Sequence, residues 1–426
     1  MKVLKFGGTS VGSAQRMKEV AKLITDGEKK IVVLSAMSGT TNTLVEISDY
    51  LYKKNPEGAN EIINKLESKY KQKALEVVKS HFDYIRSYTK DLFTLFEEKV
   101  VLAQGELIST AMVNFYLQEC GVKSVLLPAL EFMRTDKNAE PDPIYIKEKL
   151  LAQLELYPDA EIYITQGFIC RNAYGEIDNL QRGGSDYTAS LIGAAINASE
   201  IQIWTDIDGM HNNDPRIVDK TSPVRQLHFE EAAELAYFGA KILHPTCIQP
   251  AKYANIPVRL LNTMAPEAPG TLISNDTEKG KIKAVAAKEN ITAIKIKSSR
   301  MLLAHGFLRK VFEIFESYQT SIDMICTSEV GVSVTVDNTK HLNEILDDLK
   351  KYGTVTVDRD MCIICVVGDL EWENVGFEAK ALDAMRNIPV RMISFGGSNY
   401  NISFLIRECD KKVALQSLSD MLFNGK

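Results

Sequence analysis

A lysine and a group of glycines near the N-terminus are the first residues whose types could do chemistry. Lys5 lies in a short apolar run, and Gly7 and Gly8 end that run before a helix-like pattern begins. Glycines at a strand-to-helix turn let backbone N–H groups point at an anion, and the helix adds the positive end of its dipole. Together with the charge of Lys5, this arrangement suits the phosphates of a nucleotide. An ordinary tight turn would also account for the glycines.

Neither of two familiar phosphate-binding motifs is present in this segment. A P-loop needs glycine, four residues and then Gly-Lys-Ser/Thr. Gly7 and Gly12 have that spacing, but Ser13 stands where the lysine is required. The dinucleotide fingerprint G-x-G-x-x-G is absent as well. Phosphate binding here would therefore use a different kind of loop.

A second cluster, Gln-Arg-Gly-Gly-Ser-Asp, precedes a helix-like run. Arg182 offers a guanidinium for a carboxylate, and Asp186 offers a carboxylate for an ammonium group. Gly183 and Gly184 permit close approach of the backbone between them. An amino acid carries both complementary charges, so the cluster suits an amino-acid substrate. A helix capped by Ser185 or Asp186 would explain the acid but not the Arg-Gly-Gly run.

Two more polar clusters follow. Thr205–Gly209 ends a strand-like run with two acids, and Asp214 and Arg216 come shortly after it. Lys241 follows a helix-like segment that stops at Gly239. Acids, an arginine and a lysine suit a nucleotide pocket. The alternatives are that the acids only form turns and that Lys241 is a solvated lysine near a helix end.

The elements that must position these residues alternate between strand and helix. Strand patterns are expected at Lys2–Phe6, Lys30–Leu34, Ser124–Leu127, Glu161–Thr165, Ile201–Trp204 and Pro257–Leu261. Helix patterns lie between them, including a long helical stretch over 60–117. This alternation predicts an α/β fold with a mostly parallel sheet sandwiched by helices. Ligands bind outside the carboxyl ends of such strands, where the polar clusters fall.

The pattern changes after a polar stretch at 275–290, which we interpret as a linker. Beyond it, short strands and helices follow in two rounds about 70 residues apart. Gly306-Phe307 matches Gly376-Phe377, and the strand Val332–Val336 matches 401–405. Strands are also expected at Thr292–Lys297 and Ser321–Cys326. Two α+β repeats of the βαββ type would bury their bare sheet faces by pairing.

Composition narrows the class of protein. The chain has 426 residues, 45% of them apolar and 25% charged, which is ordinary for two or three globular domains. The net charge of −6 makes nucleic acid and membrane surfaces poor partners. Seven cysteines, an odd number, argue against a disulfide framework. The six histidines show no metal-binding spacing, and neither a secretory signal nor a membrane-spanning run is visible, so a cytoplasmic location is expected.

The motifs occur together and in a fixed order. They are Lys5–Val11 (KFGGTSV), Ser35–Asn42, Gly105-Glu106, Arg182–Asp186, Thr205–Gly209, Asp214–Arg216 and Phe238–Pro245. In this combination the chain resembles an aspartokinase, with the amino-acid-kinase fold followed by tandem ACT domains. No dehydrogenase-like domain follows, so the resemblance is to the monofunctional form. It implies a catalytic domain over 1–280 and a regulatory region over 291–426, divided into 291–358 and 359–426.

The resemblance implies ATP-dependent phosphorylation of the side-chain carboxylate of L-aspartate, with Mg²⁺ carried on ATP. The product, 4-phospho-L-aspartate, starts lysine, threonine and methionine biosynthesis. The nucleotide residues by analogy are Lys5, Phe6, Gly7, Gly8, Thr205, Asp206, His211, Arg216, Lys241 and Ile242, of which Lys5, Asp206 and Lys241 are catalytic. The residues that would bind the substrate aspartate by the same analogy are Thr41, Glu106, Arg182, Gly183, Gly184, Ser185 and Asp186. A carboxylate nucleophile is already ionised at neutral pH, so direct in-line transfer needs no general base.

The same resemblance implies feedback regulation by an amino acid, with lysine expected, and a homodimer or higher homo-oligomer formed through the ACT domains. The effector residues by analogy are Met301, Phe307, Leu308, Ile322, Asp323, Ser328 and Glu329. Three positions depart from the family pattern. Gln181 replaces a common Gly, His211 a common Tyr and Ala304 an expected Ser.

Two alternatives remain at this point. Another amino-acid kinase would use glutamate, acetylglutamate or a nucleotide as acceptor, and the ACT-like repeat and the Arg182–Asp186 cluster argue against it. A catalytically silent amino-acid sensor could use the same fold. The presence of Lys5, Asp206 and Lys241 argues against such a sensor.

Overall fold

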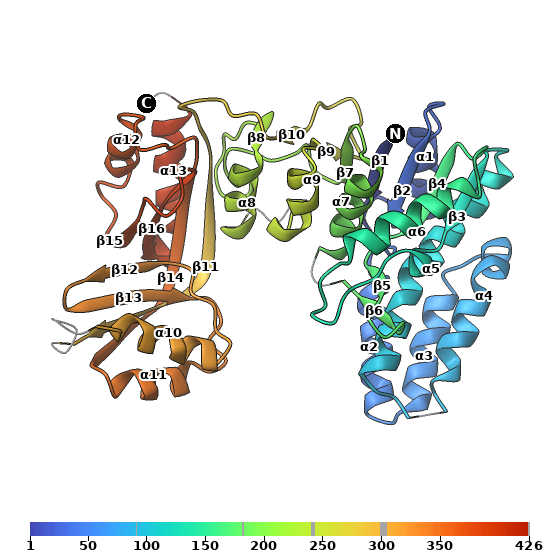
Figure 1. The fold of residues 1–426 in the computed structure, drawn as a ribbon, viewed down its shortest axis with the longest axis horizontal. Coiled ribbons are helices and arrows are strands. Elements are labelled where there is room, and N and C mark those ends of the chain that lie inside the picture. Colours follow the sequence, from blue (N-terminus) through green and yellow to red (C-terminus); the bar gives the residue numbers. More distant parts are fainter. Residues whose placement is uncertain (91, 181–182, 240–242, 299–304, 425–426) are drawn as a thin grey trace. The chain divides into compact units, whose positions relative to one another are not determined.

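The computed structural model describes residues 1–90, 92–180, 183–239, 243–298 and 305–424. The chain forms two compact units (Figure 1). The first comprises Met1–Met210 and Ile242–Asp276, and the second comprises His211–Lys241 and Thr277–Lys426.

The first unit alternates strands and helices. Its strands are β1 (Lys2–Phe6), β2 (Lys30–Leu34), β3 (Ser124–Leu127), β4 (Ile162–Gln166), β5 (Ile169–Arg171), β6 (Ile177–Asn179), β7 (Ile201–Thr205), β9 (Val258–Asn262) and β10 (Thr271–Ser274). Its helices are α1 (Ala14–Ile24), α2 (Thr40–Tyr52), α3 (Pro56–Glu67), α4 (Gln72–Ser87), α5 (Leu95–Glu119), α6 (Pro143–Glu155), α7 (Gly184–Ile196) and α9 (Gln249–Tyr253), with the 3-10 turns η1 (Ala129–Glu131) and η2 (Pro245–Ile248).

The expected parallel sheet is confirmed. Within the first unit the strand order is β3-β4-β2-β1-β7-β9-β10, and every pairing from β3 to β9 is parallel. β1 lies between β2 and β7, so Lys5 is in register with Val33 on one side and Ile203 on the other. Buried residues Val3, Leu4 and Phe6 hold this strand in the core. The strand therefore fixes the position of Lys5 firmly.

Helices α2 to α5 form a layer with its own apolar core. Leu44, Ile63, Phe82 and Ile108, one from each helix, are fully buried there. In Figure 1 these blue and cyan helices lie side by side. α5 is long and apolar enough to pass for a membrane span by length and composition, but 61% of its apolar window is buried in the protein. It is the core helix of this layer.

The second unit contains the C-terminal elements. Its strands are β8 (Gln226–His228), β11 (Ile282–Lys297), β12 (Ile325–Ser328), β13 (Gly331–Val336), β14 (Thr354–Gly368), β15 (Val390–Ser394) and β16 (Asn401–Arg407). Its helices are α8 (Phe229–Tyr237), α10 (Phe307–Ser317), α11 (Leu342–Lys350), α12 (Phe377–Ala384) and α13 (Lys411–Leu422), with the 3-10 turn η4 (Glu408–Asp410).

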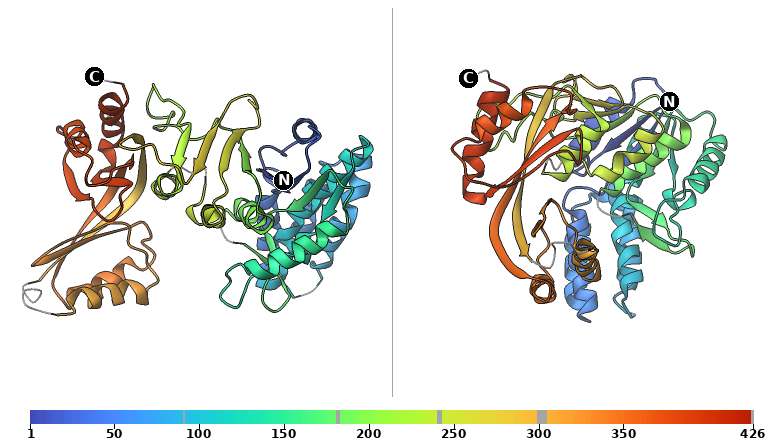
Figure 2. Two further views of the ribbon diagram at one scale, coloured as in Figure 1. Left: turned by 45° about the horizontal axis from the view of Figure 1, so that its top comes forward. Right: turned by 60° about the vertical axis from the view of Figure 1, so that its left-hand side comes forward.

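The expected repeat is also visible. Six strands pair in the order β12-β13-β11-β14-β16-β15, so the long strands β11 and β14 lie antiparallel at the centre (Figures 1 and 2). Each is followed by a helix and two further strands. Gly306 and Gly376 start the two equivalent helices with φ of 82° and 89°, a left-handed conformation that favours glycine. The two matched glycines therefore occupy the same position, directly before the helix, in both repeats.

Two predictions about this unit were wrong in detail. The stretch 275–290 is not a linker throughout, because β11 begins at Ile282. Ala284 and Val285 are buried, and the buried ammonium of Lys283 pairs with Glu278. The lysines of this stretch indicated a solvent-exposed linker, whereas the structure has a strand there. The strand expected at Ser321–Cys326 begins only at Ile325 as β12.

Candidate active site

The loops that follow the central strands all begin at the same edge of the sheet. Gly7 N donates to the carbonyl of Trp204 at 3.2 Å, and Ser35 N donates to the carbonyl of Phe6 at 3.1 Å. Gly167 N donates to the carbonyl of Leu34 at 2.9 Å. The carboxyl ends of β1, β2, β4 and β7 therefore meet at one edge, where parallel sheets bind ligands.

Lys5 and Asp186 form an ion pair at this edge. Lys5 Nζ lies 2.7 Å from Asp186 Oδ1, and each side chain is only 12% exposed. Lys5 comes from β1 and Asp186 from the first turn of α7, so the structure brings together two predicted site residues from distant parts of the sequence. A largely buried ammonium held by one carboxylate keeps a defined position and a positive charge for an incoming anion.

Close backbone packing surrounds this pair. A Cβ on Gly8 would lie 2.7 Å from the carbonyl oxygen of Ala36, and a Cβ on Gly105 would lie 2.8 Å from Ala36 Cβ. A Cβ on Gly7 would meet nothing closer than 3.6 Å. Gly8 and Gly105 are thus required for the loops after β1 and β2 to pack on α5. At Gly7, a Cβ would make only ordinary contacts, with Lys5 Nζ and the carbonyl oxygen of Trp204.

Glu106 follows Gly105 on α5 and is buried beside Ala36. Its Oε1 accepts a hydrogen bond from Ala36 N at 3.1 Å, while among the described residues no donor reaches its buried Oε2. Burial raises the pKa of the Glu106 carboxyl from 4.5 to about 7. An unpaired buried carboxylate oxygen is costly, and an ammonium group would satisfy it.

The loop before α7 also depends on glycine. Gly183 has φ of 77° and caps α7, and a Cβ there would lie 2.6 Å from Cys247 Sγ. Cys247 donates from its thiol to the Gly183 carbonyl at 3.2 Å, a contact that no sequence motif indicates. A Cβ on Gly167 would lie 2.5 Å from Ser185 Oγ. Thr41 lies in the first turn of α2, partly buried.

The predicted nucleotide residues of the first unit differ in what they can offer. The Phe6 side chain is fully buried and stacks on Trp204 with ring centroids 5.6 Å apart, so only its backbone can face a ligand. Thr205 Oγ1 accepts from Ile207 N at 3.1 Å. Asp206 follows β7 and is exposed.

Two predicted nucleotide residues belong to the second unit. His211 Nδ1 lies 2.9 Å from Thr221 Oγ1. Arg216 forms a two-point contact with Asp214, at 2.9 Å from Nε and 2.7 Å from Nη2, while its side chain stays 82% exposed. Asp214 thus holds the guanidinium in one orientation.

Four predicted residues lie outside the described part of the chain, namely Arg182, Lys241, Ile242 and Met301. Of the predicted effector residues, Phe307 is buried, Leu308 is 37% exposed, and Ser328 and Glu329 are exposed at and after the end of β12. Ile322 is partly buried, and the Asp323 side chain is 1% exposed.

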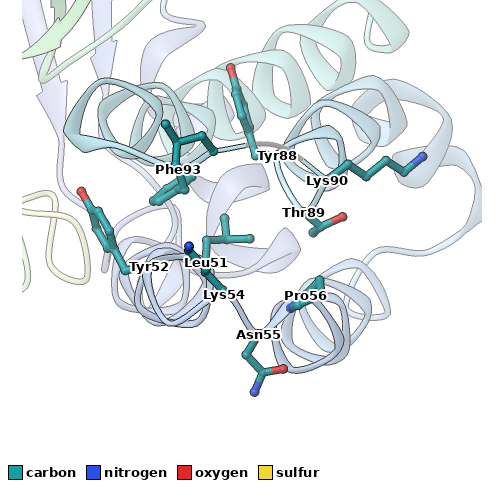
Figure 3. A pocket seen from close by; sticks show the side chains of 10 residues that line it. Leu51, Tyr52, Lys54, Asn55, Pro56, Tyr88, Thr89, Lys90 and Phe93 are labelled. Atoms are coloured by element: carbon teal, nitrogen blue, oxygen red, sulfur yellow. The ribbon is translucent and has the colours of Figure 1, made fainter.

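A pocket of about 370 Å³ opens in the helical layer, away from these residues (Figure 3). It is lined by Leu51, Tyr52, Lys54, Asn55, Pro56, Tyr88, Thr89, Lys90, Leu92 and Phe93. None of the predicted site residues is among them. Within the described ranges, no three His, Cys, Asp or Glu side chains converge on a possible metal site.

Comparison with known proteins agrees with this arrangement. Residues 1–262 match the model of the amino acid kinase family, and residues 364–422 match an ACT domain model. The chain is 36% identical to aspartokinase 1, chloroplastic, of Arabidopsis thaliana, over 99% of this chain and 80% of that one. It is 33% identical to lysine-sensitive aspartokinase 3 of Escherichia coli, over 99% of both chains.

Solved structures give the same result. The crystal structure of E. coli aspartokinase III in complex with aspartate and ADP superposes with a TM-score of 0.82 at 31% identity, covering 99% of this chain and 100% of that one. The relatives and the solved structure match nearly the whole sequence, and the two family models match its kinase part and its last repeat. The chain therefore belongs to the amino-acid kinase family and is one of its aspartokinases, an aspartate kinase with C-terminal ACT domains.

Proposed function

We propose that this aspartate kinase transfers the γ-phosphoryl group of ATP directly to the side-chain carboxylate of L-aspartate. The observation that carries the proposal is the ion pair of Lys5 and Asp186 at the carboxyl ends of the central strands. Phosphoryl transfer depends mainly on positioning and on neutralising charge. A buried ammonium beside a glycine loop serves that need, and the acceptor carboxylate requires no base.

In this proposal, the site residues divide into two groups. Lys5, Gly7 and Gly8 receive the phosphates, together with, by resemblance, Lys241, and the carboxylate of Asp206 would meet the Mg²⁺ that ATP carries. Asp186 holds Lys5 in place through the 2.7 Å contact. On the other side, Glu106 accepts the ammonium group of aspartate on its unpaired oxygen, with Thr41, the loop at Gly183–Ser185 and, by resemblance, Arg182 around the rest of the substrate. For the nucleotide, Thr205 and the backbone of Phe6 would line the site, with Ile242, His211 and Arg216 added by resemblance.

Mg²⁺ is expected to arrive with ATP. This ion needs few protein ligands, because one or two carboxylates and the substrate phosphates suffice. The exposed carboxylate of Asp206 fits that role. The ion supplies charge neutralisation on the phosphates. The chain's own lysines and glycines orient them.

A hydroxylamine trap tests the acceptor. With ATP and Mg²⁺, the protein should give a hydroxamate with L-aspartate and none above background with L-glutamate. A hydroxamate with glutamate alone would assign another amino-acid kinase activity. No product with either acid, from a folded protein that binds ATP, would instead favour a sensor.

We further propose that lysine is the feedback effector and that the product enters lysine, threonine and methionine biosynthesis in the cytoplasm. The support is the lysine sensitivity named for the E. coli relative and the carboxylates of Asp323 and Glu329 in the first repeat. Titration of lysine and threonine against kinase activity tests it, and inhibition by lysine alone is expected. Indifference to lysine would contradict it.

A homodimer through the ACT domains is the assembly we propose. β12 lies at one end of the strand order of the six-stranded sheet and exposes Ile325, an apolar side chain that an interface with a second copy would cover. Light scattering during gel filtration should give twice the chain mass of 47.5 kDa. A mass of one chain at micromolar concentration would contradict this.

A further inference from the structure

The connection between β4 and β5 contains a strained residue beside the loop at Gly183–Ser185. Phe168 has φ of 68°, a left-handed conformation that an aromatic side chain disfavours. It is the central residue of a three-residue γ-turn, in which Ile169 N donates to the carbonyl of Gly167 at 2.7 Å. A γ-turn with positive φ is rare and strained, so it persists only where neighbouring groups hold it.

Two hydrogen bonds hold the backbone of Phe168, one on each side. Its N–H donates to Thr188 Oγ1 at 3.1 Å, and its carbonyl accepts from Leu180 N at 2.7 Å. The same Thr188 hydroxyl donates to the carbonyl of Gly184 at 2.8 Å. Thr188 is fully buried, one turn after the start of α7. A single hydroxyl therefore joins the strained turn to the first residue of this helix.

The turn at Phe168 also packs tightly against the start of α7. A Cβ on Gly184 would lie 2.8 Å from Phe168 Cδ2, and a Cβ on Gly167 would lie 2.5 Å from Ser185 Oγ. At both places the two segments are as close as a missing side chain allows. A displacement of the turn would therefore displace Gly184 and Ser185 as well.

We propose that Thr188 is a positioning residue for aspartate binding, whose hydroxyl fixes the turn at Phe168 against α7 and so keeps Gly184 and Ser185 in place for the substrate. The inference rests on the aspartate-binding role proposed above for Gly183–Ser185. Thr188 acts through these neighbours, because its own side chain is fully buried. Without the hydroxyl, the N–H of Phe168 loses its acceptor and the strained turn loses one of its two backbone anchors.

Replacement of Thr188 by valine removes the hydroxyl and nearly keeps the size of the side chain. Thr188→Val should raise KM for aspartate about tenfold, as expected for losing one hydrogen bond, while kcat stays within about threefold of the wild-type value. KM for ATP should change by less than about twofold, because Asp186 has its own contact with Lys5 at 2.7 Å. Thr188→Ser retains the hydroxyl and should restore KM for aspartate to within about twofold of the wild type.

Ser190→Ala is the matched control on the same helix. Ser190 is fully buried like Thr188, but its Oγ has no hydrogen-bond partner among the described residues. Its replacement should leave both KM values within about twofold of the wild type. A rise of KM for aspartate as large as in Thr188→Val would show that any buried change in α7 disturbs the site, and it would overturn the specific role of Thr188.

Hydrogen–deuterium exchange measures the contact of Phe168 with Thr188 directly. Exchange of the Phe168 amide should become about tenfold faster in Thr188→Val and stay near the wild-type rate in Thr188→Ser and Ser190→Ala. A residue that merely supports the fold would instead speed exchange along the whole of α7 and would lower kcat together with the affinity for both substrates.

The possible failures are distinguishable. A wild-type KM for aspartate in folded Thr188→Val would overturn the positioning role, whatever the exchange shows. Unchanged exchange of the Phe168 amide in this variant would show that the hydroxyl does not fix the turn. If the wild-type enzyme formed no hydroxamate with aspartate, the proposed function would fail, and the exchange would still decide whether Thr188 fixes the turn.

Discussion

The environment of Glu106 decides how this carboxyl can act. Burial lifts its pKa to about 7, so near neutral pH the group is partly protonated in the free enzyme. Because the folded value lies above the unfolded value of 4.5, the group stabilises the free folded protein at low pH. That contribution is lost as pH rises through about 7.

Aspartate binding should therefore release a proton. If the substrate ammonium pairs with ionised Glu106, about half a proton per site should leave on binding near pH 7. Calorimetry in two buffers of different ionisation enthalpy measures this number directly. Glu106→Gln should abolish the release, and Glu98→Gln, on the same helix α5, should retain it. Equal release in the wild type and Glu106→Gln would refute the assigned role.

Single residues differed in how far the sequence could place them. Lys5 and Asp186 follow from their motifs, since a strand end and a helix start in a parallel sheet must meet at one edge. The contacts of Cys247 with Gly183 and of Tyr237 with Asp323 could not be predicted. They join residues 64 and 86 positions apart through packing that no periodic pattern records.

Backbone proximity explains the glycine pattern at the level of the elements. The loops after β1 and β2 approach so closely that Gly8 has no room for a side chain, whereas Gly7 has. The sequence shows both glycines alike. The structure distinguishes them, because a Cβ on Gly8 would lie 2.7 Å from the carbonyl oxygen of Ala36, whereas a Cβ on Gly7 would meet nothing closer than 3.6 Å.

Alanine substitutions should separate these two glycines. Gly8→Ala should reduce the free energy of unfolding in urea by about 1–3 kcal/mol, because its Cβ collides with a carbonyl oxygen that cannot move easily. Gly7→Ala should change this free energy by less than about 0.5 kcal/mol. Equal destabilisation by both would show that the close approach of the loops is not maintained in solution.

Strand and helix limits followed the sequence wherever the periodicity was strong. β1, β2 and β3 have the predicted limits. β11 was missed over its first half because Lys283 and Lys288 lie on either side of a short run of small apolar residues there. A buried lysine that pairs with Glu278 cannot be told from a solvent-exposed lysine in the sequence. Ion pairs of this kind depend on partners that only the fold supplies.

For the whole molecule, the order of motifs predicted the family and the fold class. The repeat offset of about 70 residues was enough to expect paired α+β repeats, which the six-stranded sheet confirms. The boundaries of the two compact units were harder to predict from the sequence. Residues His211–Lys241 cluster with the C-terminal unit although they lie within the stretch that matches the kinase family model. Contacts rather than sequence order decide that division.

The central claim is that the Lys5 ammonium, held by Asp186, stabilises the phosphoryl group during transfer to aspartate. Rapid-quench measurement of acyl-phosphate formation in a single turnover tests it most directly. Lys5→Met should lower this rate by about 100- to 1000-fold with folding intact. Lys2→Met, on the same strand but in a surface ion pair with Glu28, should leave it within about twofold of the wild type. A near-normal transfer rate in folded Lys5→Met would contradict the account.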